Sequence, residues 1–408
     1  MAADACKTLE LIEYQPRFLP KDALPTEIGE AIFRQYGSMI EVIFPSLATE
    51  GRWRLTSLGW VGHLPVTYDF ALSIRPKVPL LNLFRMWEYA YNLQSFQFLQ
   101  GLNSCGSIDE LFDHLASILA KKVLDRGRKG LYRAYDPRQE QLPYARGRLD
   151  VAAALRRPWE PYLPWHYEEH TADITDNRIL AWTLHLVSRS GLCHDDASRN
   201  VRRANHLLQS AATLEAFVAS DCLGRLYHRL NEDYQPLHAF CRFFLDHCGP
   251  LHQTGDKGML PFQANMSSLF EAFVAAWLQP HLPDHLVLRR QETIYFTGQA
   301  PFCFRLDLVL CERATNRPVC IMDTKYKGHA KPQESDIQQV VAYAHSLGCR
   351  EAILIYPREL EQPIDAVIGE THVRALTFAL EGDLEMAGER LLSELGTMLA
   401  PTAEAVFA

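Results

Sequence analysis

The amino-acid sequence predicts an α+β protein of several domains, and three changes of pattern along its 408 residues support this prediction. Short runs that alternate apolar and polar residues fill residues 1–80 and predict a β-rich region suited to contacting a partner. Helical periodicity dominates residues 81–250, which predicts a mainly helical domain. Helix and strand patterns alternate in residues 251–408, which predicts a C-terminal α/β domain. Domains usually span ~100 to 200 residues, so two or three sizeable cores fit in this length.

The N-terminal region contains three runs with the two-residue period of a β-strand. They are Met39–Phe44, Trp53–Leu55 and Phe70–Ile74, with turn-forming residues such as Gly51 between them. Arg75-Pro76-Lys77 comes directly after the third run. A cation presented on a β-rich projection is suited to stabilising phosphate charge in a partner's nucleotide site. An ordinary turn at the end of a strand explains the same residues equally well.

The middle region has strong helical patterns and few strand signals. Helices are expected at Ile108–Leu124, Asp176–Val187 and Ala197–Ala219. The segment Lys121–Arg148 is rich in lysine and arginine with interleaved tyrosines, which suits contact with a phosphate backbone or with a partner. Acidic residues dilute its charge, so a solvated helix end and loop is the alternative interpretation.

A pair of histidines in the same region has the spacing of a metal site on a helix. His166 and His170 are four residues apart and would share one helical face. Pro161 and Pro164 disfavour a helix there, so metal binding by this pair is the less favoured interpretation. Further along, the glycine-containing loop His252–Pro261 is expected to be a linker or a mobile element.

The C-terminal region has the predicted order helix, hairpin, helix and strand. Ser267–Leu278 repeats apolar residues at helical spacing, and Ser335–Ala344 does the same. Between these helices, Phe302–Leu310 and Val319–Tyr326 alternate like strands around a segment of turn composition, which predicts a β-hairpin. Glu351–Pro357 is a nearly continuous apolar run, as expected for a strand that is buried on both faces.

Two acidic residues and a lysine are predicted to meet on this hairpin. If its turn centres near Thr315, residues whose numbers sum to about 630 face each other, so Asp307 lies opposite Asp323 with Cβ atoms roughly 5 Å apart. Lys325 lies two residues further on, on the same face. Facing carboxylates repel each other, so the pair must share a proton, face open water or hold a cation. Mg²⁺, a hard cation that prefers oxygen ligands, fits such a pair best.

The lysine adds a catalytic interpretation to the acidic pair. Lys325 beside a metal ion would orient a water or stabilise the negative charge that develops on a phosphate, which is what phosphodiester hydrolysis requires. The spacing therefore suits a metal-dependent nuclease. A solvent-exposed hairpin face, on which Lys325 only neutralises its neighbours, is the plainer alternative.

The helices on either side of the hairpin carry two further candidates. Glu271 lies in the first turn of the first helix, although Ser268 and Glu271 also match a capping box that would bond only the helix start. Gln339 shares a face of the second helix with Asp336 and Tyr343, of which Tyr343 is expected to be a packing residue.

This combination resembles the PD-(D/E)xK nuclease superfamily over about residues 265–378. The resemblance rests on Glu271, on Asp307, on Asp323-Thr324-Lys325 and on Gln339. It implies that Asp307 and Asp323 ligate metal, that Glu271 supports the metal shell, that Lys325 positions the attacking water or stabilises the transition state, and that Gln339 is an accessory site residue. Leu306 stands where the motif has proline, a departure that the loose motif tolerates.

Five short phrases are spread along most of the chain: Trp60-Val61-Gly62-His63, Leu72–Val78, Arg146–Asp150, Asp176–Leu180 and Asp323–Lys327. In this order they resemble the McrC family, the nuclease subunits of McrBC-type modified-cytosine restriction systems. The resemblance implies a partner, the AAA+ GTPase ring McrB, which binds GTP, recognises modified DNA and translocates it. It also implies that the chain itself stimulates this GTPase and cuts DNA.

Bulk properties exclude several functional classes. The net charge of −8 disfavours strong autonomous binding to DNA, so affinity must be local or come from a partner. The sequence lacks a P-loop, so GTP hydrolysis is expected to belong to the partner. It contains no apolar run long enough to span a membrane and no signal-peptide pattern, which predicts a cytoplasmic protein without membrane contact. The ten cysteines lack zinc-ligand spacing and are expected to be reduced and mostly buried.

Three functional hypotheses follow from these observations. The leading one is a Mg²⁺-dependent DNA endonuclease that works docked to an NTP-driven ring. The second is a catalytically inert activator, in which the nuclease fold is a docking scaffold and the acidic pair stays empty. The third is a stand-alone nuclease acting on branched or single-stranded DNA, with Lys121–Arg148 supplying affinity.

Overall fold

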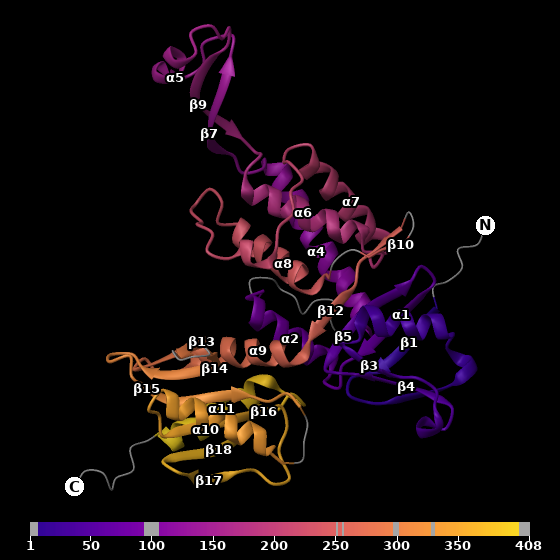
Figure 1. Cartoon of the computed structure of the whole chain (residues 1–408). Coiled ribbons are helices and arrows are strands. Elements are labelled where there is room, and N and C mark those ends of the chain that lie inside the picture. Colours follow the sequence, from indigo (N-terminus) through magenta and orange to yellow (C-terminus); the bar gives the residue numbers. More distant parts are fainter. Residues whose placement is uncertain are drawn as a thin grey trace. The chain divides into compact units, whose positions relative to one another are not determined.

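The computed structural model describes residues 7–93, 106–249, 252–254, 257–296, 302–327 and 331–399. It is a mixed α/β structure that divides into two compact units (Figure 1). The first unit combines the N-terminal part, Met1–Ile108, with the C-terminal part, Gln263–Ala408. The second unit, Asp109–Phe262, is inserted between them in the sequence.

The N-terminal part of the first unit contains two small sheets and a helix. One sheet has the strand order β1-β6-β5-β12, and the other has the order β2-β4-β3. Helix α1 packs against them, and Ile32, Tyr36 and Trp53 are almost completely buried in their common core. The elements are β1 (Lys7–Ile12), β2 (Arg17–Pro20), α1 (Thr26–Tyr36), β3 (Ile40–Ile43), β4 (Arg52–Ser57), β5 (Trp60–Thr67), β6 (Phe70–Arg75) and β12 (Phe262–Asn265).

The three strands expected in this region are present as β3, β4 and β6, whereas helix α1 was not predicted. Ile28, Ile32 and Tyr36 recur at the four-residue spacing of one helical face, and all three contribute to the core. The helix therefore has its own apolar stripe, which the search for alternating runs overlooked.

The C-terminal part of the first unit is built on a six-stranded sheet with the order β13-β14-β15-β16-β18-β17. Strands β13, β14 and β15 are antiparallel neighbours, whereas β15, β16 and β18 run parallel. The chain passes from β15 to β16 through helix α10, as a parallel pair requires. The elements are β13 (Leu286–Phe296), β14 (Phe302–Glu312), β15 (Pro318–Thr324), α10 (Glu334–Ser346), β16 (Glu351–Tyr356), β17 (Asp365–Ile368) and β18 (Thr371–Thr377).

Helices cover this sheet and connect it to the N-terminal part. Val340 and Ala344 of α10 are buried against the sheet residues Ile321 and Leu354. Three other helices are α2 (Leu80–Tyr91), α9 (Met266–His281) and α11 (Leu384–Leu399). Helix α9 packs against α2, α11 and the strands β13 and β15, and α11 packs against β18. The buried side chain of Asn82 donates 2.8 Å hydrogen bonds to the carbonyl groups of Leu380 and Gly382, which ties α2 to the segment before α11.

The second unit is mainly helical, but it also contains a three-stranded sheet with the order β7-β9-β8 (Figure 1). Few strand signals were expected there, and this expectation is wrong for residues 134–171. Strands β7 and β9 pair over nine residue pairs, although both contain charged residues and a proline. The elements are α4 (Ile108–Lys129), β7 (Ala134–Leu142), β8 (Arg148–Leu149), α5 (Val151–Arg156), β9 (Leu163–Thr171), α6 (Thr175–Arg189), α7 (Asp195–Gln209) and α8 (Tyr234–His247).

The loop predicted at His252–Pro261 contains a short antiparallel pair. Strand β10 (His252–Thr254) pairs with β11 (Lys257–Met259). Leu251, Gly255 and Asp256 lie outside the described residues. The predicted role of this segment as a mobile element stays a prediction.

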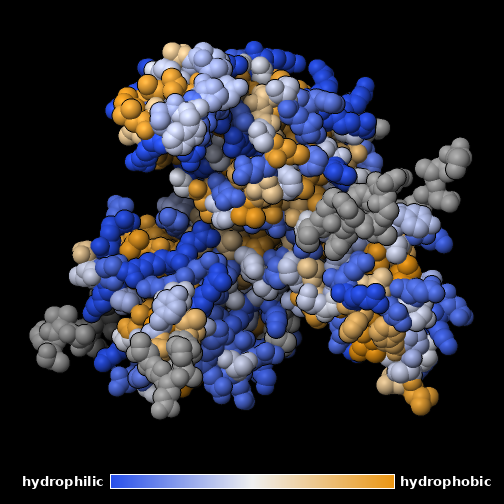
Figure 2. Space-filling view, turned by 45° about the horizontal axis from the view of Figure 1, so that its top comes forward, coloured by the Kyte–Doolittle hydropathy of each residue, from blue (hydrophilic) through white to orange (hydrophobic). Residues whose placement is uncertain are grey.

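Hydrophobic side chains form separate patches among hydrophilic ones on the face shown in Figure 2. In the N-terminal part, Phe18 of β2, Phe33 of α1 and Leu47, between β3 and β4, are exposed. Within the described part of the chain, no helix combines the length and the apolarity that crossing a bilayer requires.

A buried glutamate joins the N-terminal part to the C-terminal sheet. Glu13 follows β1 and is 0% exposed. Its Oε2 accepts a 3.0 Å hydrogen bond from the Tyr326 hydroxyl and a 3.3 Å bond from the backbone N–H of Lys77, while Oε1 has no hydrogen-bond partner. Burial raises the pKa of Glu13 from its ordinary 4.5 to about 7.

Replacing Glu13 with glutamine is expected to stabilise the protein at neutral pH. Because the folded-state pKa is raised, the wild-type protein loses stability as the pH rises from about 4.5 to about 7, and the loss persists above that range. At about 1.4 kcal/mol per pH unit the loss is roughly 3 kcal/mol. Unfolding of wild type and Glu13→Gln at about pH 5 and about pH 8 measures it. If the free energies of unfolding of wild type and Glu13→Gln differ by the same amount at both pH values, the proposed cost of burying the Glu13 charge is wrong.

Candidate active site

Strands β14 and β15 pair in the register predicted from the sequence. Leu308 faces Met322 and Val309 faces Ile321, so Asp307 and the next residue of β15 follow directly at the end of the ladder. Oδ2 of Asp307 accepts a 3.0 Å hydrogen bond from the backbone N–H of Thr324 and a 3.2 Å bond from its hydroxyl. The structure therefore brings Asp307 to the segment that carries Asp323 and Lys325.

Asp323 is a buried carboxyl beside a lysine. It is 2% exposed, and its Oδ2 lies 2.8 Å from Nζ of Lys325. Burial raises the pKa of Asp323 from its ordinary 3.8 to about 7, and the charge of Asp307 adds to the rise. Proton uptake is thus one answer to the repulsion between the two acids, and a cation placed between them would displace that proton.

Lys325 lies among oxygen atoms that come from two elements. Besides Asp323, its Nζ lies 3.5 Å from Oδ1 of Asp336 and donates a 3.0 Å hydrogen bond to Oε1 of Gln339, both on α10. Burial disfavours the charge of Lys325, but the carboxylates of Asp323 and Asp336 outweigh this effect and raise its pKa above the ordinary value. The side chain is therefore a fixed ammonium group at neutral pH.

Helix α10 holds the lysine through a chain of hydrogen bonds. Nε2 of Gln339 donates a 2.7 Å bond to the Tyr343 hydroxyl one turn later, which leaves Oε1 of Gln339 to accept from Lys325. Tyr343 is 7% exposed and also belongs to the core under α10, so its predicted packing role is present together with a polar one. Sequence periodicity indicates the packing face but not the hydroxyl's partner.

Glu271 approaches the acidic pair from α9. Burial raises the pKa of Glu271 above its ordinary value, and the charge of Asp307 adds to this effect. The alternative that Glu271 caps the helix is not realised, because α9 begins one turn earlier, where the side chain of Asn265 accepts a 3.0 Å hydrogen bond from the N–H of Ser268.

Gln291 is a site residue that sequence reasoning missed. Its Nε2 donates a 3.1 Å hydrogen bond to Oε1 of Glu271. Its φ of 50° lies in the left-handed region, where the β13–β14 ladder skips the pair between Arg290–Leu308 and Glu292–Leu306. Such backbone conformations recur at functional sites. A glutamine within a strand pattern carries no signal that would have revealed this contact.

The residues present fit a hard divalent cation by their donor chemistry. Asp307, Asp323 and Glu271 offer carboxylate oxygens, and burial together with the charge of Asp307 raises the pKa values of Asp323 and Glu271. No trio of acidic, histidine or cysteine side chains in the described ranges forms a ready metal cage. Mg²⁺ does not need one, since it keeps several waters and takes only one or two carboxylates.

The predicted histidine pair lies on a strand and not on a helix. His166 and His170 belong to β9, where four residues span roughly 13 Å and the two rings cannot share one ion. Nε2 of His166 lies 3.3 Å from Oδ2 of Asp150, and the ring of His170 packs against Tyr135 with centroids 5.0 Å apart. The helical spacing argument for a metal site here is wrong.

The basic segment Lys121–Arg148 runs from the end of α4 through β7 to β8, and much of its charge is neutralised locally. Four of its arginines form ion pairs with nearby acids, which favours the interpretation that acidic residues dilute this segment. These pairs are Arg126–Asp233, Arg128–Asp125, Arg138–Asp136 and Arg146–Glu169.

Arg75-Pro76-Lys77 lies at the end of β6. Arg75 forms a 2.8 Å ion pair with Glu10, and Nζ of Lys77 lies over the Tyr14 ring at 5.5 Å. The predicted contact of this segment with a partner's phosphates stays a prediction.

The eight cysteines that the structure describes are all unpaired, and most of them are buried, as expected.

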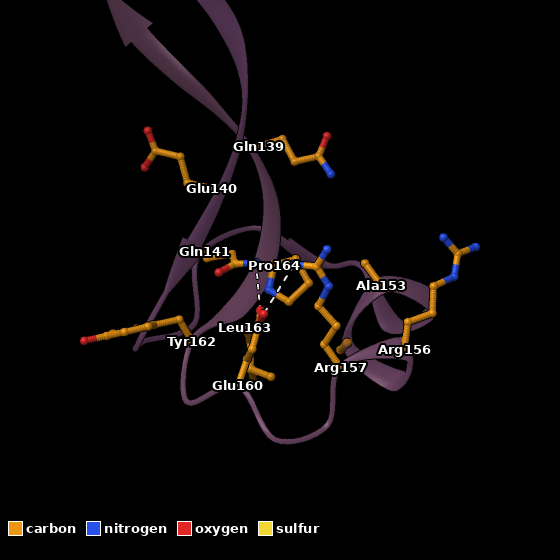
Figure 3. A pocket seen from close by; sticks show the side chains of 11 residues that line it. Gln139, Glu140, Gln141, Ala153, Arg156, Arg157, Glu160, Tyr162, Leu163 and Pro164 are labelled. Atoms are coloured by element: carbon orange, nitrogen blue, oxygen red, sulfur yellow. Dashed lines mark hydrogen bonds and ion pairs between the residues drawn. The ribbon is translucent and has the colours of Figure 1, made fainter.

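A polar pocket of about 370 Å³ lies between β7, α5 and β9 (Figure 3). Its central carboxylate, Glu160, accepts a 3.0 Å hydrogen bond from Nε2 of Gln141 and a 3.3 Å bond from Arg157. Because these polar groups bond to one another, we interpret the pocket as a structural feature of the small sheet.

The short phrase at Asp176–Leu180 also has a structural role. Asn177 is 0% exposed, and its side-chain amide donates to the carbonyl groups of Tyr132 and Ala172 at 2.9 and 2.7 Å. Asp176 pairs with Arg225 at 2.6 Å. The two bonds from Asn177 connect α6 to the residues that precede β7 and follow β9.

Comparisons with known proteins agree with this architecture. The type IV methyl-directed restriction enzyme EcoKMcrBC of Escherichia coli strain K12 is 22% identical over 320 residues, which cover 69% of this chain and 87% of that protein. A chain in the half-complex from the tetradecameric assembly of Thermococcus gammatolerans McrB AAA+ hexamers with bound McrC matches with a TM-score of 0.57 and 16% identity, over 96% of this chain and 100% of that one.

The match to a family model extends over most of the chain. The model for the McrBC 5-methylcytosine restriction system component matches residues 55–357, which include the end of β4, strands β5 and β6, the second unit, and the hairpin of β14 and β15. The chain therefore belongs to the McrBC 5-methylcytosine restriction system component family, as a McrC-like subunit.

Proposed function

We propose that this chain is the Mg²⁺-dependent DNA endonuclease subunit of a GTP-dependent restriction complex that cleaves DNA with modified cytosine. The observation that carries the proposal is the meeting of Asp307, Asp323 and Lys325 at the end of the β14–β15 ladder. The elements around these residues follow in the order α9, β13, β14, β15, α10 and β16. This order contains the helix, hairpin, helix and strand expected from the resemblance to PD-(D/E)xK nucleases, with β13 as an additional strand. Family membership supports a role in a restriction complex.

The acidic residues would hold the ion. Asp307 and Asp323 are the proposed ligands, with Glu271 supporting the shell. When bound, Mg²⁺ supplies positive charge that polarises a phosphoryl oxygen and lowers the pKa of a coordinated water. Thr324 holds one oxygen of Asp307 with two hydrogen bonds, which orients the carboxylate and leaves its other oxygen to face the ion.

Lys325 would act as a fixed positive charge. Its raised pKa favours the charged form at neutral pH, so we assign Lys325 to orienting the attacking water or stabilising charge on the scissile phosphate. Gln339 and Asp336 hold the ammonium group in place from α10. The catalytic contribution is then electrostatic, which suits phosphoryl transfer.

The proposed partner is a McrB-like AAA+ GTPase ring that binds GTP, and the chain would stimulate that GTPase when docked. The net charge of −8 disfavours strong autonomous DNA binding, so a ring that holds the DNA would supply what this chain lacks. The solved structure that this chain resembles is described as McrB AAA+ hexamers with bound McrC. Its fold similarity supports the same kind of assembly here.

Replacing Asp307 with alanine is expected to lower the DNA cleavage rate of the assembled complex by ~10³-fold or more, because residues that act as one catalytic unit fail together. Stimulation of the partner's GTPase should persist, since Asp307 belongs to the nuclease site alone. The measurement is single-turnover cleavage of DNA with modified cytosine, alongside GTP hydrolysis. Asp365→Ala, on the exposed edge strand β17, is the matched control. Wild-type cleavage by Asp307→Ala would refute the site.

The affinity of the site for Mg²⁺ is expected to rise with pH. The pKa of Asp323 is raised to about 7, so below that pH the metal must displace a proton, and the affinity should fall up to tenfold for each pH unit. Titration calorimetry of the full chain from about pH 6 to about pH 8 measures the affinity and the released proton. An inert scaffold would show no heat that depends on Asp307, and a pH-independent affinity would contradict the role of Asp323.

Assembly with the AAA+ partner is expected to depend on GTP. Mixing this chain with the ring protein and a non-hydrolysable GTP analogue should give one large complex by mass measurement. Efficient cutting by the isolated chain with Mg²⁺ and no ring would instead favour the stand-alone nuclease.

A further inference from the structure

The bond between Glu13 and Tyr326 lies directly beside the proposed catalytic lysine. Strand β15 ends at Thr324, and the next residue, Lys325, keeps one bond to the sheet, from its N–H to the carbonyl group of Ile355 at 2.8 Å. Tyr326 follows and is 7% exposed. Its hydroxyl donates to Glu13, which the sequence places more than 300 residues earlier. The backbone of Lys325 is therefore held from both sides.

The ring of Tyr326 also contacts the helix that carries Glu271. Its centroid lies 6.0 Å from that of Phe270, the residue before Glu271, and 6.5 Å from that of Tyr14, the residue after Glu13. The N–H of Met266, the first residue of α9, donates a 2.9 Å hydrogen bond to the carbonyl group of Gly59 in the N-terminal part. The N-terminal sheets thus contact both segments from which the site is built.

Glu13 is itself fixed by the N-terminal part. Its backbone N–H donates a 3.0 Å bond to the carbonyl group of Arg75, and its Oε2 accepts from the N–H of Lys77. The carboxyl group cannot turn away into solvent because it is fully buried. The Tyr326 hydroxyl, which donates to this carboxyl group, is therefore held in a defined position.

We propose that Glu13 and Tyr326 are positioning residues for Lys325, through which the N-terminal sheets set the place of the ammonium group relative to Asp307 and Asp323. Lysine has four rotatable bonds, so its charge is placed accurately only if its backbone is fixed and its end is bonded. Asp323, Asp336 and Gln339 bond the end, and Tyr326 fixes the backbone. Misplacing a catalytic group by about 1 Å costs ~10²-fold in rate. This inference rests on the proposed nuclease function.

The test compares tyrosine variants in the full chain assembled with its AAA+ partner. Tyr326→Phe removes the hydroxyl that bonds Glu13 and should lower single-turnover DNA cleavage at least tenfold. Tyr36→Phe is the matched control, because it also removes a buried hydroxyl, one bonded to the carbonyl group of Pro65 at 2.7 Å inside the N-terminal core. It should cleave at the wild-type rate. The Mg²⁺ affinity of Tyr326→Phe should stay within twofold of wild type, since the metal ligands are unchanged.

Two further variants separate positioning from general stability. Glu13→Gln keeps an oxygen acceptor for Tyr326 and should retain cleavage, whereas Glu13→Ala should lose it to the same extent as Tyr326→Phe. In a Lys325→Ala background, Tyr326→Phe should have no additional effect, because its influence passes through the lysine. The inference would be overturned if Tyr326→Phe lowered the cleavage rate by the same factor in the Lys325→Ala background as in wild type. Wild-type cleavage by Tyr326→Phe would overturn it as well.

Cleavage by Asp307→Ala distinguishes a wrong nuclease site from a wrong positioning role for Tyr326. If Asp307→Ala cleaves normally, the proposed nuclease site is wrong, and the role of Tyr326 falls with it. If Asp307→Ala is inactive while Tyr326→Phe is not, the nuclease assignment stands and only the positioning role is wrong.

Discussion

Repulsion between two carboxylates at the end of one antiparallel ladder is the constraint around which the C-terminal sheet is organised. Asp307 receives two hydrogen bonds from Thr324, and Asp323 receives the ammonium group of Lys325. Helix α10 then holds that ammonium group with an amide and a second carboxylate. Burying such charges costs several kcal/mol per ion unless they are well paired. The residue before Asp323 in β15, Met322, is equally buried but apolar, so it carries no such cost.

Local patterns were sufficient to predict the hairpin and its register. Alternation in β14 and β15 with a turn between them constrains which residues face each other, and Leu308–Met322 obeys that constraint. The resemblance implied that Gln339 is an accessory site residue, but its hydrogen bond with Lys325 was not predicted. Strands β7 and β9 were missed because their charged and proline residues obscure the alternation. Gln291 and Glu13 were missed because each meets its partner only in the folded chain.

The arrangement of the first unit bears on the two activities proposed for this family member. The N-terminal sheets, for which contact with a partner is a prediction, and the hairpin of β14 and β15 belong to one compact unit. The backbone N–H of Lys77, in the loop after β6, and the hydroxyl of Tyr326 both donate to the same oxygen of Glu13, Oε2. A partner bound near that loop would meet a structure already connected to the site. Separate domains on a flexible linker would lack this connection.

The order of synthesis gives the inserted second unit a further meaning. Strand β5 leaves the ribosome long before β12, its neighbour in the four-stranded sheet. At ~5–20 residues per second, translation of the intervening stretch takes roughly ten to forty seconds. The hairpin of β14 and β15 follows later still, so every strand of the four-stranded sheet is synthesised before Asp307 and Asp323. A polypeptide released before that hairpin lacks both of the proposed metal ligands.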